Sequence, residues 1–118
     1  MLLIGRQHSG ETHSSFILHG LINFLVSRDN LAFQLREKFE FWILPCMNPD
    51  GIVCGNYRCN TQGKDMNRYF FADDDEEVNI RLTEVELIRS FMLEHFDPKD
   101  EVKKTKLKMF LDIHAHSA

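Results

Sequence analysis

Short apolar runs alternate with longer segments of helical periodicity along this chain. Three of the runs are typical of buried strands and cover residues 1–5, 39–44 and 107–114. Four consecutive apolar residues at 41–44 indicate burial on both faces, as in a parallel sheet. Pro45 ends that strand, because proline cannot donate a hydrogen bond to the sheet ladder.

Apolar residues at helical spacing predict a helix over residues 12–27, with a face so wide that we expect it to be largely buried. Gly20 lowers the stability of this helix by about 1 kcal/mol relative to alanine, so we expect it to mark a close packing contact. A second, shorter helix is predicted over residues 29–38. Its inward-facing residues are expected to be Leu31, Ala32 and Leu35.

A third helix is predicted over residues 83–96. Thr83 and Glu86 fit a capping box, in which Thr83 is the N-cap and Glu86 returns the hydrogen bond. Asp97 and Pro98 end the helix, because the residue before a proline avoids helical geometry. Residues 99–106 are charged and are expected to form an exposed loop.

Residues 46–82 are expected to form a long irregular connection that begins with the turn sequence Asn-Pro-Asp-Gly at 48–51. A connection of this length in a compact domain is usually functional or disordered. The acidic run at 73–77 is interpreted as a solvated, mobile loop. The connection also carries side chains suited to holding an anion, namely Asn56, Tyr57, Arg58, Asp65, Asn67, Arg68 and Tyr69.

The predicted order of elements is that of one small α/β domain, with a mostly parallel central sheet flanked by helices. Ligands in such sheets bind beyond the carboxyl ends of the strands. His8, Asn48 and His114 all lie at or just past those ends. The fold alone therefore directs attention to these three side chains.

Composition narrows the class of protein. The 118 residues carry a net charge of −4, which argues against a nucleic-acid partner, and no apolar run approaches the length of a membrane span. The first fifteen residues have no features of a signal peptide. Three cysteines, an odd number, fit buried or half-buried free thiols in a reducing compartment.

His8 and Glu11 lie three residues apart where the first strand turns into the first helix. Zinc binds histidine nitrogen at about 2.0–2.1 Å and carboxylate oxygen at a similar distance, and a catalytic zinc needs a third protein ligand and an open position. His114 is the candidate third ligand. The alternative for the pair alone is a helix N-terminus whose first-turn glutamate meets the helix dipole.

Four ordered motifs together resemble the zinc metallocarboxypeptidases. They are His8-Ser9-Gly10-Glu11, Asn48-Pro49-Asp50-Gly51, Asp65-Met66-Asn67-Arg68 and Asp112-Ile113-His114. The segments at 55–59 and 114–117 are similar to those of the cytosolic carboxypeptidase subfamily. The resemblance covers nearly the whole chain and implies part of a mixed, mostly parallel sheet of that fold.

The resemblance also implies a role for individual residues. One zinc ion would be held by His8, Glu11 and His114, and Arg58 would polarise the scissile carbonyl and stabilise the oxyanion. Asn67 and Arg68 would hold the terminal carboxylate of the substrate. Asp65 would accept a hydrogen bond from the other nitrogen of His8, and His116 would line the site.

The implied activity is removal of C-terminal residues from proteins or peptides by a zinc-activated water, in the cytoplasm, with the glutamates of acidic tails such as those of tubulin as substrates. Members commonly have proline at the place of Ser9 and glycine at that of Ala115. No glutamate matches the family's general base. We therefore expect residues 1–118 to be an incomplete, N-terminal part of a catalytic domain, poorly stable and catalytically incomplete alone.

Two other functions stay open. A zinc amidohydrolase of acyl-amino acids would keep the three metal ligands but would not need Asn67 and Arg68, so the intact pair favours the peptidase. The other alternative is a truncated, non-catalytic pseudoenzyme that binds carboxylate tails.

Overall fold

The computed structural model describes residues 1–70 and 82–115. The strands are β1 (Leu2–Gly5), β2 (Trp42–Leu44) and β3 (Phe110–Ile113). The α-helices are α1 (His13–Leu25), α2 (Asn30–Lys38), α3 (Pro49–Val53) and α4 (Thr83–Phe96). Two short 3₁₀ helices complete the described elements, η1 (Met66–Arg68) and η2 (Lys103–Thr105).

The three strands form one parallel sheet in the order β2-β1-β3. The central strand β1 is buried along its whole length, and its Leu3 pairs with Ile43 on one side and Leu111 on the other. Because all strands point the same way, their carboxyl ends meet at one edge of the sheet. The predicted α/β fold with a parallel sheet is confirmed.

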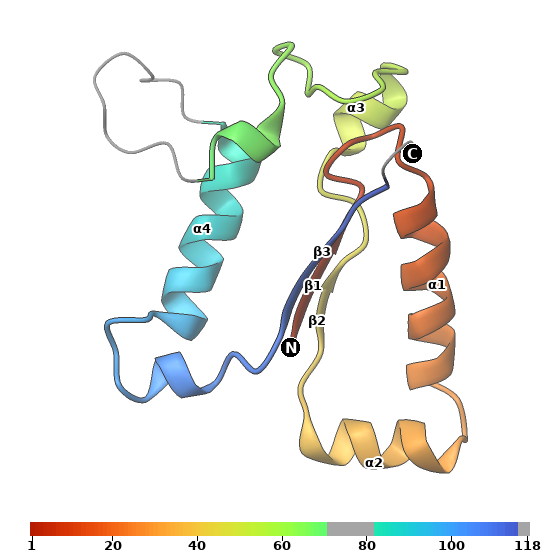
Figure 1. Cartoon of the computed structure of the whole chain (residues 1–118), viewed down its shortest axis with the longest axis vertical. Helices are drawn as coiled ribbons and strands as arrows, with labels where there is room; N and C mark the ends of the chain where they lie inside the picture. Colours follow the sequence, from red (N-terminus) through yellow and green to blue (C-terminus); the bar gives the residue numbers. More distant parts are fainter. Residues whose placement is uncertain (71–81, 116–118) are drawn as a thin grey trace.

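Helices lie on both sides of the strands, with α1 on one side and α4 on the other (Figure 1). Successive residues of β1 point to opposite faces. A Cβ at Gly5 would lie 2.6 Å from Leu18 of α1, so that face packs closely on the helix. The opposite face carries Ile4, which packs in a core cluster with Met66 and with Val85 of α4.

The irregular connection predicted for residues 46–82 contains α3 and η1, so that prediction is wrong in part. Asn48 is the N-cap of α3, and its Oδ1 accepts a hydrogen bond of 2.9 Å from the Gly51 N–H. Pro49 occupies the first helical turn, where a missing N–H has no cost. The same four residues that signal a turn therefore start a helix. The acidic run lies outside the described residues.

The predicted capping box is also wrong. The helix α4 begins at Thr83 itself, with Leu82 at the N-cap and no side-chain cap hydrogen bond. Leu82 is buried, so packing of an apolar residue, rather than a hydroxyl cap, fixes the start of this helix. The strands β2 and β3 are shorter than predicted, and the charged loop contains η2.

The helix α1 is less buried than predicted, since the sheet covers only one of its sides. Phe16 and Ile17 are 76% and 52% exposed, and a Cβ at Gly20 would meet nothing within 4 Å, so Gly20 marks no close contact. In α2, Ala32 is buried while Leu31 is exposed, which corrects the predicted inward face. Of the three free cysteines, Cys54 is exposed rather than buried.

Leu18→Ala is expected to lower the free energy of unfolding by about 2–5 kcal/mol, because it leaves a cavity beside Gly5 in the fully buried contact between α1 and β1. Ile17→Ala, on the exposed side of the same helix, should change it by less than about 1 kcal/mol. Urea unfolding of the full-length protein compares the two. Equal losses would contradict this placement of the core.

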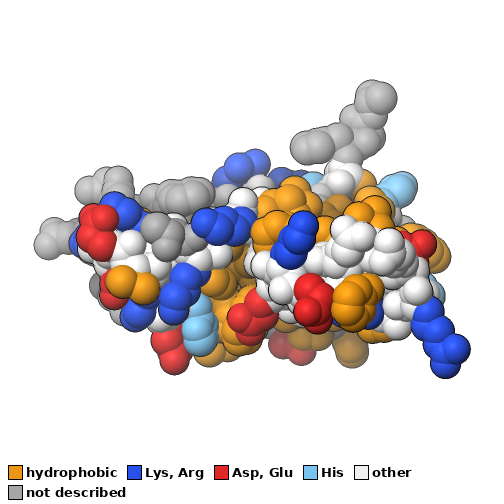
Figure 2. Space-filling view, turned by 90° about the horizontal axis from the view of Figure 1, so that it is seen from below, with side chains coloured by type: hydrophobic (Ala, Val, Ile, Leu, Met, Phe, Trp, Pro, Cys, Tyr) orange, Lys and Arg blue, Asp and Glu red, His pale blue; other side chains and the backbone are white. Residues whose placement is uncertain are grey.

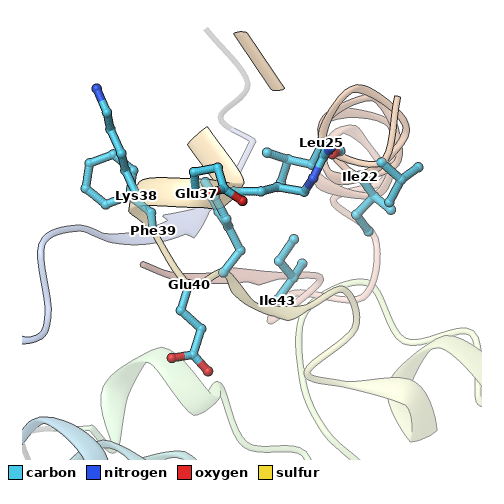
Figure 3. A pocket seen from close by; sticks show the side chains of 10 residues that line it. Ile22, Leu25, Glu37, Lys38, Phe39, Glu40 and Ile43 are labelled. Atoms are coloured by element: carbon cyan, nitrogen blue, oxygen red, sulfur yellow. The ribbon is translucent and has the colours of Figure 1, made fainter. Parts of the chain in front are cut away.

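A hollow of about 550 Å³ lies between the end of α1, α2 and β2, lined by Ile22, Leu25 and Ile43 among other residues (Figure 3). Seen from the α2 end, hydrophobic side chains on the surface lie among charged ones (Figure 2). This hollow is at the opposite end of the strands from His8 and His114. Among the described residues, no helix is long and apolar enough to cross a membrane.

Candidate metal centre

The turn between β1 and α1 places His8 and Glu11. It opens with Arg6 in the left-handed region, at φ 53°, which redirects the chain as it leaves the sheet. Such a conformation costs roughly 1–2 kcal/mol for a residue with a Cβ. The Arg6 guanidinium offsets this cost, because its Nε donates to the Ser9 carbonyl at 2.9 Å and its Nη1 donates to Ser15 Oγ at 3.0 Å.

His114 follows β3 directly, and the pairing of β3 with β1 brings it beside this turn. His8 Nδ1 lies 2.8 Å from Glu11 Oε1 and 3.1 Å from His114 Nδ1. His114 Nδ1 is 3.1 Å from Glu11 Oε2. One possible ligand atom from each residue lies within 4.8 Å of the others, so the three residues could hold a metal ion. His8 and Glu11 are buried, and His114 is half-buried.

The chemistry of this donor set fits a zinc ion. A histidine that binds zinc through Nδ1 carries its ring proton on Nε2, and Asp65 Oδ1, 2.9 Å from His8 Nε2, would accept that hydrogen bond while the Nδ1 lone pair faces the ion. That lone pair faces a second imidazole nitrogen and a carboxylate oxygen, an arrangement that needs a cation or a proton between them. Tetrahedral zinc separates such ligand atoms by roughly 3.3 Å, close to the separations found here.

Asp65 joins the metal group to the residues expected to bind substrate. Its Oδ1 faces His8 and also accepts from the Asn67 N–H at 3.0 Å, while its Oδ2 accepts from Arg58 Nε at 2.7 Å. Burial alone raises the pKa of Asp65, but the hydrogen bonds with His8, Arg58 and the Asn67 N–H outweigh it and leave the pKa below its usual value. Asp65 is therefore a carboxylate anion.

Glu11 is held in its charged form in the same way. Burial raises the pKa of its carboxyl group, but the Ala115 N–H donates to Oε2 at 2.8 Å, and His8 and His114 add a hydrogen bond and favourable charge. The net effect lowers the pKa of Glu11 below its usual value. Glu11 and Asp65 are therefore both negatively charged beside the histidines.

Asp112 was assigned no role from the sequence. Its Oδ2 lies 2.9 Å from His114 Nε2, although the two atoms are not aligned as a hydrogen bond, and the structure gives His114 Nε2 no hydrogen-bond partner among the described residues. Asp112 is in β3 and His114 comes two residues later, just past the end of the strand, so the two side chains lie side by side. The Asp-x-His spacing was the available signal.

The residues expected to bind substrate lie at different distances from this group. The Arg58 side chain is 39% exposed, and one of its terminal nitrogens is 4.0 Å from Glu11 Oε1. Arg68 is more exposed, and its Nε lies 3.7 Å from Asp65 Oδ2. Asn67 is exposed and lines a hollow of about 410 Å³ between α4 and β3. His116 lies outside the described residues.

Asn48 does not join the group. It is fully buried, caps α3 and donates from Nδ2 to the Cys59 carbonyl at 3.2 Å, so its role in the structure is to hold the 55–60 loop.

Asp65→Asn is expected to weaken zinc binding by roughly 10- to 100-fold, because the neutral amide no longer orients and polarises His8. Chelator competition measures the affinity. The control Asp50→Asn changes an exposed carboxylate outside the group and should leave it unchanged. Equal zinc affinities in the parent, Asp65→Asn and Asp50→Asn would contradict the role given to Asp65.

Comparisons with known proteins show which family the chain resembles. The model of the zinc carboxypeptidase family matches residues 1–118. Human cytosolic carboxypeptidase 6 is 44% identical over 117 residues, which cover 99% of this chain and 22% of that protein. Cytosolic carboxypeptidase 6 of Caenorhabditis elegans is 35% identical, with 24% of its length covered. The chain thus spans about a quarter of the length of these relatives.

Solved structures show the same fold. A metallo-carboxypeptidase from Burkholderia cenocepacia superposes with a TM-score of 0.77 at 33% identity, over 98% of this chain and 28% of that one. A metallo-carboxypeptidase from Pseudomonas aeruginosa, in complex with (2-guanidinoethylmercapto)succinic acid, has a TM-score of 0.76 at 34% identity, over 98% and 28%. The chain therefore belongs to the zinc carboxypeptidase family.

Proposed function

We propose that the protein containing this stretch is a zinc-dependent carboxypeptidase, and that residues 1–118 are part of its catalytic domain. The observation that carries the proposal is the convergence of His8, Glu11 and His114 beside the Arg58 guanidinium. Two imidazoles and a carboxylate are a donor set typical of catalytic zinc in peptidases. When bound, zinc supplies Lewis-acid chemistry, polarising a carbonyl oxygen and lowering the pKa of water.

Arg58 is suited to stabilise negative charge on the scissile carbonyl oxygen. Its guanidinium stays charged at all relevant pH values, and its contact with Asp65 fixes its direction before substrate arrives. A fixed cation of this kind acts most strongly where charge develops in the transition state.

Asn67 and Arg68 are suited to hold the terminal carboxylate of the substrate. A guanidinium binds a carboxylate through two parallel hydrogen bonds, and an amide adds a donor. Both side chains are exposed, and both belong to η1, whose start is capped by the same Asp65 that contacts His8. The distance between the terminal carboxylate and the bond to be cut is thereby set by one short turn.

None of the described carboxylates at this site is free to act as general base. Glu11 faces both histidines, Asp65 faces His8 and Arg58, and Asp112 faces His114. We infer that the base lies outside the described residues. The part described here then supplies metal binding, charge stabilisation and recognition of the carboxylate.

The finer proposal concerns the substrate. The relatives are named cytosolic carboxypeptidases, and the two exposed arginines near the site favour an acidic chain. We propose that the substrates are C-terminal glutamates of protein tails in the cytoplasm, with polyglutamylated tubulin as the first to test.

The test compares two peptides with the full-length, zinc-loaded protein. Both end in several glutamates, one as a free acid and the other as a C-terminal amide. Mass spectrometry should show stepwise loss of glutamate from the acid alone, and none after zinc is removed. Equal cleavage of the amide, or activity without metal, would contradict the proposal. Hydrolysis of N-acetylglutamate in place of the peptides would indicate the amidohydrolase, and binding without cleavage the pseudoenzyme.

A further inference from the structure

Two segments far apart in the sequence are joined at the metal centre. The turn that carries His8 and Glu11 is attached to the loop at residues 55–60, which carries Arg58. The Ser9 hydroxyl donates to the Asn56 carbonyl, and the Gly10 N–H donates to the Tyr57 carbonyl at 2.6 Å. Ser9 is 2% exposed, so its hydroxyl is removed from competing water.

The approach of the two segments is close enough to need a glycine. A Cβ at Gly10 would lie 2.3 Å from the Tyr57 ring and 2.9 Å from the Tyr57 carbonyl oxygen. The carbonyl is part of the backbone and cannot turn aside as a flexible side chain would. The contact is therefore backbone against backbone, and it allows little room for the loop to shift.

The far side of the loop is fixed as well. The side-chain amides of Asn48 and Asn56 both donate to the Cys59 carbonyl, each at 3.2 Å. Arg58 lies between these attachments and those from Ser9 and Gly10. Its backbone is therefore held on both sides, and its guanidinium is directed by Asp65 at 2.7 Å.

We propose that Ser9 is a positioning residue, whose hydroxyl fixes Arg58 relative to the metal ligands. The proposal rests on the proposed function, in which Arg58 stabilises charge on the carbonyl oxygen. The Ser9 hydroxyl is turned to the Asn56 carbonyl and the Ser9 carbonyl is held by Arg6, so neither group faces the substrate or the metal. Ser9 acts through the loop alone.

The expected effect is on turnover rather than on substrate binding. Charge on the carbonyl oxygen appears fully only in the transition state, so a displaced Arg58 lowers kcat and leaves KM almost unchanged. Loss of one buried hydrogen bond corresponds to a fall of roughly three- to tenfold. Ser9→Ala should show this fall with unchanged zinc content and a Tm lowered by only a few degrees, and Ser9→Thr, which keeps a hydroxyl, should restore most of the lost kcat.

A double-mutant cycle in the full-length protein tests the route through Arg58. If Ser9 acts by placing that guanidinium, Ser9→Ala has no further effect on kcat once Arg58→Ala is present. The control is Ser27→Ala, which removes a hydroxyl that accepts the Asp29 N–H at 3.2 Å, away from the site. The proposal would be overturned if Ser9→Ala left kcat unchanged, or if it lowered kcat equally in the parent protein and in Arg58→Ala. It would also be overturned if Ser9→Ala lost zinc together with activity.

Hydrogen exchange supplies a readout that does not depend on activity. Ser9→Ala should speed amide exchange in peptides covering residues 55–60, whereas Ser27→Ala should not. Unchanged exchange in this loop would overturn the proposal. If the parent protein releases no C-terminal residue, the proposed function fails, and the exchange experiment still decides whether Ser9 holds the loop that carries Arg58.

Discussion

His114→Ala is expected to remove most of the zinc from the purified protein. The change leaves two protein ligands, His8 and Glu11, of the three that converge. Loss of an outer hydrogen-bonding partner weakens metal binding by roughly 10- to 100-fold, and loss of a ligand itself should cost more than that. His8→Ala should behave in the same way and would also leave Asp65 without its imidazole partner.

The measurement is the zinc content of equally purified proteins, followed by the affinity from chelator competition. His19→Ala is the matched control, because His19 is exposed on α1 and takes no part in the metal group. Equal zinc content in His8→Ala, His114→Ala and the parent would contradict the assignment of the ligands. Loss of zinc from His19→Ala as well would point to general misfolding.

Arg58→Ala is expected to lower kcat by roughly 10²- to 10³-fold, the usual effect of removing one group that stabilises an oxyanion. Zinc content should be retained, because Arg58 contacts the metal group only through Asp65 and at 4.0 Å from Glu11. Arg58→Lys should recover only part of the loss, since an ammonium lacks the planar fork that reaches Asp65 and the substrate together.

Steady-state kinetics on the glutamate-ended peptide would measure this effect. Arg28→Ala changes an exposed cation between α1 and α2 and should leave kcat within about twofold of the parent. A kcat for Arg58→Ala close to that of Arg28→Ala would remove Arg58 from the proposed chemistry.

The sequence predicted which residues follow the strands but not how the strands are ordered. His8 and His114 are 106 positions apart, and they meet because β3 pairs with β1 in parallel register. Periodicity gives the length and burial of a strand and says nothing of its neighbours. The four ordered motifs supplied that missing information, because they carried the resemblance to a fold in which the strand ends converge.

Tertiary contacts override the local sequence pattern in α1 and at the start of α4. The wide apolar face of α1 predicted a largely buried helix, yet Phe16 is 76% exposed because the sheet lies against one side of the helix only. Thr83 fits a capping pattern, yet buried Leu82 decides where α4 begins. Local pattern shows what a segment could bury or cap, and the tertiary contacts determine what it does.

The attachment of Arg58 through Ser9 and Gly10 could not be read from the sequence at all. It depends on hydrogen bonds to the carbonyl groups of Asn56 and Tyr57, and every residue has a carbonyl group. Contacts of this kind leave no pattern of residue types.

The most direct test of the metal centre is X-ray diffraction from crystals of the full-length protein at wavelengths on either side of the zinc absorption edge. The ligand assignment predicts one anomalous peak, present only above the edge, within about 2.0–2.2 Å of His8 Nδ1, His114 Nδ1 and a Glu11 carboxylate oxygen. A zinc peak on other residues, or none in protein purified with zinc, would contradict it.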